Sequence, residues 1–98
     1  VQAAVNVNVL KAGMTHSVED GYVGFVHFEV EGHVRKYEMA LQSKKGRDWG
    51  YSLFFLDGSG PEEQIELVED AIEDDDDLYF RLIGEAKAQL AEEAAPEA

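Results

Sequence analysis

Four consecutive aspartates at residues 74–77 are the part of this chain whose residue types are best suited to holding a metal ion. Asp74, Asp76 and Glu85 fall at positions one, three and twelve of a calcium-binding EF-hand loop, which coordinates the ion through oxygen ligands. Positions five and six would be Leu78 and Tyr79, where that loop requires an oxygen ligand and a glycine. The spacing therefore does not match an EF-hand, and we predict no metal and no cofactor.

The same aspartate run has a structural interpretation. Aspartate is a poor helix former but a good N-cap, and negative charge is stabilised at a helix N-terminus. We therefore expect the run to end one helix and to cap the next. The alternative is that its carboxylates belong to an acidic face that binds a partner.

The histidines and hydroxyl residues of the first half are the other candidates for chemistry. His27 and His33 are expected on opposite faces of a hairpin, so that they cannot easily share a metal ion. Residues 15–20 place a threonine, His16, a serine and two carboxylates in one loop. A catalytic triad needs a rigid scaffold to set its geometry, and we predict no catalytic residues and a protein that is not an enzyme.

Lys44, Lys45, Arg47 and Trp49 form a basic and aromatic cluster. Such a cluster can contact phosphate or stack on a base, but three bases in a chain of net charge −13 make a weak nucleic-acid site. The cluster can instead contact the acidic half of its own chain or of a second copy, and Trp49 can anchor a protein interface. The remaining alternative is a solvated turn with Trp49 packed against the core.

Net charge is distributed unevenly along the chain. Residues 1–50 hold six acidic and six basic residues, whereas residues 51–98 hold fifteen acidic residues and two basic ones. Direct binding to nucleic acid or to an anionic membrane requires a cationic surface, and we expect neither. The asymmetry favours a basic protein partner, because long-range attraction speeds such an association.

Length and composition bound the class of protein. A chain of 98 residues, of which 45% are hydrophobic, predicts one domain around one core. We place this single α+β domain at residues 1–91 and a flexible acidic tail at residues 92–98. No stretch is apolar over the ~20 residues of a membrane span, and the absence of cysteine favours a cytoplasmic location.

The N-terminal segment predicts one strand and a long connection. Residues 3–10 alternate valine with asparagine, which is typical of a strand with one polar face. Residues 11–21 are mostly polar and too long for a tight hairpin, so we expect an extended loop or a short turn of helix. The position of this strand in the sheet stays open, because its connection does not force it beside the next strand.

Residues 22–30 and 33–42 predict a hairpin, since both are rich in β-branched and aromatic residues and a glutamate and a glycine between them suit a two-residue turn. Pairing Val30 with His33 places Val26 opposite Tyr37 on the more apolar face. The other face is not purely polar, because the same register places three apolar side chains there: Val23, Phe25 and Val34.

The second half predicts one more strand and two helices. Residues 51–56 are apolar on both faces and need cover on both sides. Ser59 and Glu62 fit a capping box that starts a helix, and apolar stripes precede and follow the aspartate run. The fold class is therefore α+β, with a four-stranded, mainly antiparallel sheet followed by two acidic C-terminal helices packed on one face, in the order ββββαα.

These observations predict a small non-enzymatic protein, an interaction or inhibitor module whose acidic helical half binds a basic protein surface. The biological process is not identified by the sequence. The candidate partner-binding residues are acidic side chains of the helical half together with the tryptophan: Glu66, Glu69, Asp70, Glu73, Asp74, Asp75, Asp76, Asp77 and Trp49.

Three alternatives stay open. A homo-oligomeric structural protein, such as a homodimer, would associate through its sheet, with Val23, Phe25 and Val34 in the interface. A DNA mimic would present rows of carboxylates in place of phosphates. A small-ligand binder or an enzyme would need convergent polar groups in a pocket, and few can be named.

Overall fold

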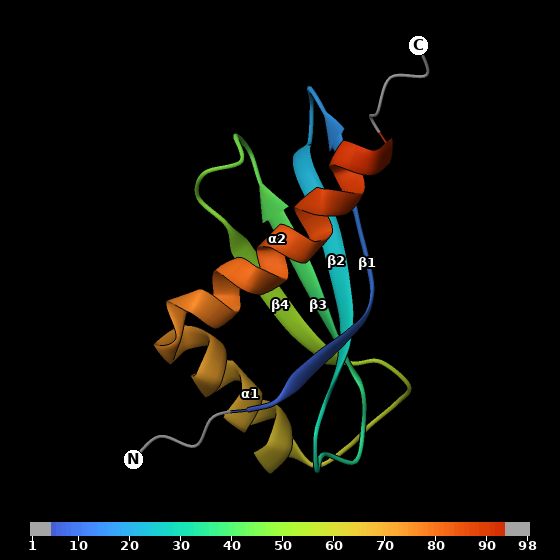
Figure 1. The fold of residues 1–98 in the computed structure, drawn as a ribbon, viewed down its shortest axis with the longest axis vertical. Helices are drawn as coiled ribbons and strands as arrows, with labels where there is room; N and C mark the ends of the chain where they lie inside the picture. The colour runs from blue at the N-terminus through green and yellow to red at the C-terminus, as the bar shows by residue number, and fades with distance from the viewer. Residues whose placement is uncertain (1–4, 94–98) are drawn as a thin grey trace.

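The computed structural model describes residues 5–93, with side chains through residue 90. The strands form one antiparallel sheet in the order β1-β2-β3-β4, and Figure 1 shows α2 lying across it. The predicted ββββαα fold is confirmed, and β1 lies beside β2. The elements are β1 (Val7–Ser17), β2 (Gly21–Val30), β3 (Tyr37–Ser43), β4 (Gly50–Phe55), α1 (Glu62–Asp74) and α2 (Asp76–Glu93).

β1 is longer than predicted. The predicted strand at residues 3–10 is confirmed from Val7 onward, whereas the predicted loop at residues 11–21 is wrong, because one strand spans Val7–Ser17; residues 3 and 4 lie outside the described part. A β-bulge between Val9 and Lys11 moves the inward-facing positions from odd to even residues. Val9 and then Met14 both pack against the core as a result. A strict alternation cannot be followed across such a bulge.

The turn between β1 and β2 is tight. Ser17 Oγ accepts a hydrogen bond from the Asp20 amide at 2.9 Å, and Gly21 follows with a φ of +75°. A Cβ on Gly21 would also lie 2.6 Å from the Ser43 carbonyl oxygen. Glycine is therefore required here by its backbone angle and by the close approach of β3.

The register between β2 and β3 differs from the predicted one by two residues. Phe28 pairs with Tyr37 and Val26 with Met39, so the predicted pairing of Val26 with Tyr37 is wrong. A shift of two residues leaves every side chain on its predicted face, because the side-chain period of a strand is two.

The cause of the shift is the connection at residues 31–36, which replaces the predicted two-residue turn. Arg35 Nε donates a hydrogen bond to the Ser59 carbonyl oxygen at 3.0 Å, and the Val34 amide donates to Gln64 Oε1 at 2.9 Å. These contacts hold the connection against the segment that leads into α1. Val34 therefore lies outside β3, and its predicted place on the sheet face is wrong.

The two helices separate at Asp75, as predicted. α1 begins after Pro61 without a side-chain hydrogen bond to cap it, so the predicted capping box at Ser59 is wrong; proline with its preset φ leads into the first turn instead. α2 extends to Glu93, so that residues 92–93 of the predicted tail are helical. Residues 94–98 lie outside the described part of the chain.

Both helices cover the same side of the sheet, which we call the helix side. The Tyr37 ring lies between those of Phe28 and Phe55, at centroid distances of 5.5 Å and 5.8 Å. The buried core lies between the sheet and the helices and consists of Met14, Val26, Phe28, Val30, Tyr37, Met39, Leu41, Val68, Ile72, Leu78, Leu82, Ile83 and Ala86.

The side chains that alternate with these along the strands point to the other side of the sheet, which we call the open face. By the strand pairing, the open face consists of Asn8, Lys11, Gly13, Thr15, Val23, Phe25, His27, Glu29, Glu38, Ala40, Gln42, Gly50, Ser52 and Phe54.

Candidate protein-interaction site

α1 presents its acidic residues to solvent because its apolar stripe faces the sheet. Val68 and Ile72 are each 1% exposed, and Ile65 and Ala71 pack beside them. The carboxylates of α1 and of the helix junction are all exposed, and we call these ten residues the acidic surface: Glu62, Glu63, Glu66, Glu69, Asp70, Glu73, Asp74, Asp75, Asp76 and Asp77.

Asp75 ends α1 and caps α2. Its backbone is extended, with φ −122° and ψ 95°, and its amide donates a hydrogen bond to the Ala71 carbonyl oxygen. Its Oδ1 accepts hydrogen bonds from the amides of Asp77 at 3.0 Å and Leu78 at 3.3 Å. The prediction that the aspartate run ends one helix and caps the next is confirmed. Asp76 and Asp77 then occupy the first turn of α2, where the helix dipole stabilises negative charge.

The acidic surface contains no base of its own. Residues 62–77 include no lysine or arginine. The next base along the chain is Arg81, whose Nη2 donates a hydrogen bond to the Val7 carbonyl oxygen at 3.2 Å. The charges on this side of the molecule therefore reinforce one another and give it a negative potential.

Three aromatic side chains lie beside the acidic surface, and no pattern in the sequence marks them as a group. Phe80 is 62% exposed. Its ring stacks on Tyr79 at a centroid distance of 5.9 Å, and Tyr79 lies 5.4 Å from Tyr51 of β4. The Tyr51 hydroxyl donates a hydrogen bond to Glu73 Oε2 at 3.0 Å. We call Tyr51, Tyr79 and Phe80 the aromatic strip.

The phenols of the aromatic strip are held in their neutral form. Burial raises the pKa of Tyr51 above its usual value of 10, and the hydrogen bond to Glu73 and the charges of Glu73 and Glu69 raise it further. Burial and the charge of Glu73 also raise the pKa of Tyr79. A cation that approaches this point meets neutral aromatic rings beside carboxylates, which is a favourable combination.

Trp49, a predicted partner-binding residue, is partly buried against the core. Its ring lies 6.0 Å from that of Tyr22. Its carbonyl oxygen accepts a hydrogen bond from the Tyr79 hydroxyl at 2.9 Å. The structure therefore connects Trp49 to the aromatic strip through its backbone, and its role as an anchor for a partner stays a prediction.

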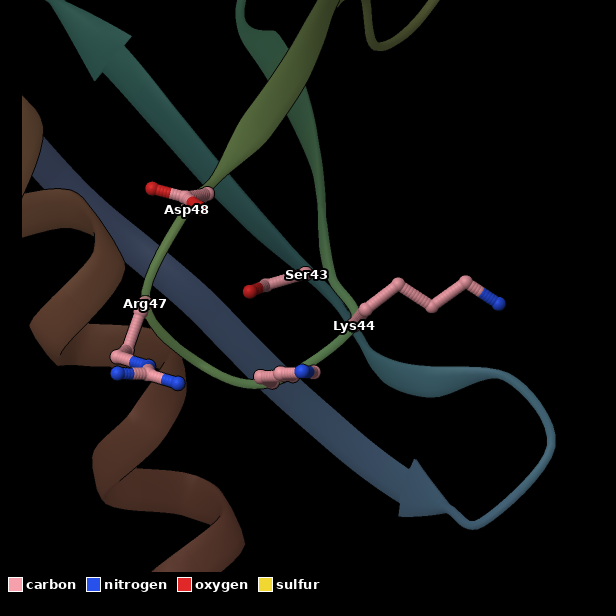
Figure 2. A pocket seen from close by; sticks show the side chains of 5 residues that line it. Ser43, Lys44, Arg47 and Asp48 are labelled. Atoms are coloured by element: carbon pink, nitrogen blue, oxygen red, sulfur yellow. The ribbon is translucent and has the colours of Figure 1, made fainter.

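The basic cluster lies on the loop between β3 and β4. Figure 2 shows that the Lys44 and Arg47 side chains point away from each other, around a hollow that Ser43 and Asp48 also line. Ser43 Oγ accepts a hydrogen bond from the Gly46 amide at 2.8 Å, which shapes the loop. The basic groups of Lys44 and Arg47 therefore do not converge on one point.

The three histidines have different surroundings. The His16 ring contacts that of Tyr22 at a centroid distance of 4.3 Å. His27 lies on the open face, whereas His33 Nδ1 shares a hydrogen bond of 2.8 Å with the hydroxyl of Tyr37, whose ring lies on the helix side. Among the described residues, no group of three or more histidine, aspartate or glutamate side chains is placed to hold a metal ion.

Comparisons of the chain with protein-family models, with curated proteins and with solved structures give no match. Within residues 5–93, no helix has the length and apolar character needed to cross a membrane. Since fold alone does not define function, what the chain does is inferred from the residues of the site.

Proposed function

We propose that the chain is a non-enzymatic interaction module whose acidic surface binds a basic surface on another protein. The observation that carries this proposal is the set of ten exposed carboxylates over residues 62–77, with no lysine or arginine among them. A negative potential of this kind attracts a cationic partner over a distance and raises the rate of encounter. The same potential repels phosphate groups and anionic lipids.

The aromatic strip adds an anchoring point to this surface. Binding energy at protein interfaces is concentrated in a few residues, often aromatic ones. A cation over Phe80 would gain a cation–π contact, worth ~0.5–2 kcal/mol, in addition to the attraction of the acidic surface. Arginine suits this arrangement better than lysine, because its planar guanidinium stacks on a ring and pairs with a carboxylate at the same time.

The proposal is tested by calorimetric titration of the chain with a synthetic arginine-rich peptide at low salt. We expect binding that weakens as salt is added, because screening reduces the attraction between exposed charges. A lysine-rich peptide of equal charge is expected to bind less tightly. Absence of binding to either peptide at low salt would contradict the proposal.

Two four-site variants separate the acidic surface from net charge. The first neutralises α1 (Glu66→Gln, Glu69→Gln, Asp70→Asn, Glu73→Gln), and the second neutralises the same number of aspartates and glutamates in the first half (Glu19→Gln, Asp20→Asn, Glu29→Gln, Glu31→Gln). We expect the first variant to bind the arginine-rich peptide about tenfold more weakly, or 1.4 kcal/mol, and the second to change binding by less than about twofold. Equal losses would mean that net charge alone attracts the peptide.

A further inference from the structure

The open face differs from the polar surface that an antiparallel sheet usually turns to water. Val23 and Phe54 are 47% and 50% exposed there, and Phe25 and Ala40 lie between them in the sheet. Both helices pack on the helix side, so the fold leaves these apolar side chains without cover. Adjacent exposed apolar side chains on a folded protein mark a surface that binds something.

Strand pairing arranges the centre of the open face in three rows that run across the sheet. The middle row is Gly13, Phe25, Ala40 and Ser52; one flanking row is Lys11, His27, Glu38 and Phe54; the other is Thr15, Val23, Gln42 and Gly50. The Phe25 ring lies over Gly13, where an added Cβ would come within 2.6 Å of it. The remainder of the middle row therefore carries small side chains only. Within these three rows, the charged and titratable groups lie in the row of Lys11, His27 and Glu38, and Glu29 lies beyond that row at the same end of the sheet.

We infer that the open face binds the open face of a second copy of this chain. A two-fold axis along the middle row places the charged row of each copy against the uncharged row of the other, so that no like charges meet. It also places Phe54 of each copy over Gly50 of the other. The large exposed ring on this face therefore lies opposite a glycine, which has no side chain. Two sheets packed face to face, with the same patch used by both subunits, have this geometry.

The distribution of charge favours this face over any other for self-association. The chain has a net charge of −13, so two copies repel each other. When the open faces meet, two sheets separate the two acidic surfaces, and the repulsion between those surfaces is weakened by distance and by salt. Lys11 also offsets part of the charge of Glu29 and Glu38 on the open face itself. The dimer leaves the acidic surface free, and the inference does not depend on the proposed function.

Sedimentation equilibrium at increasing protein concentration tests the inference with Phe54→Asp and Phe80→Asp. The two phenylalanines have similar exposure, 50% and 62%, but lie on opposite sides of the molecule. We expect wild type and Phe80→Asp to reach twice the chain mass of 10.9 kDa, and Phe54→Asp to remain at the chain mass. Added salt should strengthen the dimer, because it screens the repulsion between the two copies.

Crosslinking tests the same inference with a substitution that, unlike Phe54→Asp, adds no charge to the interface. The chain has no cysteine, so Ala40→Cys and Lys87→Cys each introduce a single thiol, on the open face and on α2. A short bismaleimide should join Ala40→Cys chains into covalent dimers and leave Lys87→Cys chains without a crosslink. A wild type that stays monomeric at every concentration would overturn the inference. Association that Phe80→Asp abolishes and Phe54→Asp preserves would also overturn it.

Discussion

On the helix side of the sheet, Val26, Phe28 and Met39 are 0% exposed, whereas Val23 and Phe54 on the open face keep about half of their surface in contact with solvent. Both sets are apolar and lie in the same sheet. The difference is that α1 and α2 cover one set and leave the other uncovered. Burial of apolar surface is the main source of folding stability, so the open-face residues contribute little to the fold and are available to a partner.

Charge is concentrated on the helix side of the molecule, whereas the exposed apolar side chains lie on the open face. The acidic surface lies on the outer side of the helix layer, while the open face has a lysine, a histidine and two glutamates. A basic partner and a second copy of the chain would therefore bind to different sides. They would also respond oppositely to salt, which weakens attraction in the first case and repulsion in the second.

The largest expected effect comes from truncating one phenylalanine on each side. Phe28→Ala removes a fully buried ring from the core, where its neighbours cannot close the cavity, and we expect a loss of about 3–5 kcal/mol in the free energy of unfolding. Phe54→Ala removes a ring that is 50% exposed, and we expect a loss below about 1.5 kcal/mol. Urea unfolding of dilute protein measures both. Equal losses would show that the open face is covered in the isolated chain.

A smaller effect is expected from the carboxylates. Asp75→Ala removes the side chain that accepts two amide hydrogen bonds at the start of α2, at a cost of about 1 kcal/mol. Asp75→Asn should retain nearly all of that stability, because asparagine caps equally well. On the open face, Glu38→Gln removes a carboxylate whose Oε2 lies 3.5 Å from His27 Nε2, and exposed contacts of this kind contribute less than about 1 kcal/mol even when both groups are charged. Thermal unfolding of the three variants separates capping from charge.

The division into two sides could be predicted from the sequence, because it depends on the two-residue period of strands. Val26 and Tyr37 were assigned to the covered face with the wrong pairing partners, and an error of two residues does not change the face. The position of Val34 depends on a hydrogen bond from its amide to Gln64 in α1. A contact between such distant residues leaves no local signal. The bulge after Val9 was also unpredictable, since nothing in its sequence separates it from the end of a strand.

The carboxylates of the candidate site were predictable and its aromatic strip was not. Val68 and Ile72 define the buried stripe of α1, and the acidic residues follow as its exposed remainder. Tyr51 comes from β4 and meets Tyr79 only because α2 packs beside that strand. Phe80 lies off the apolar stripe of α2, and this was the one local indication that an aromatic ring would be exposed.

The smallest expected effect concerns the tyrosines on the helix side at alkaline pH. Burial raises the pKa of Tyr51 and of Tyr79, and the nearby carboxylates add to both shifts, whereas a tyrosine in the unfolded chain loses its proton near pH 10. Above about pH 10 the unfolded state therefore holds fewer protons than the folded state. The free energy of unfolding is fully retained below that pH and falls as the pH rises further.

Tyr51→Phe should make this alkaline decline shallower, because it removes a phenol that the folded chain keeps protonated. Phe54→Tyr is the matched change on the open face, where a new phenol half in water should titrate as it does in the unfolded chain and leave the decline unchanged. Urea unfolding at a series of pH values from about 8 to about 11 measures both slopes, on either side of the usual tyrosine pKa. If Phe54→Tyr steepened the decline as well, its phenol would be shielded from water, and in dilute protein the open face would then have a cover within the chain itself.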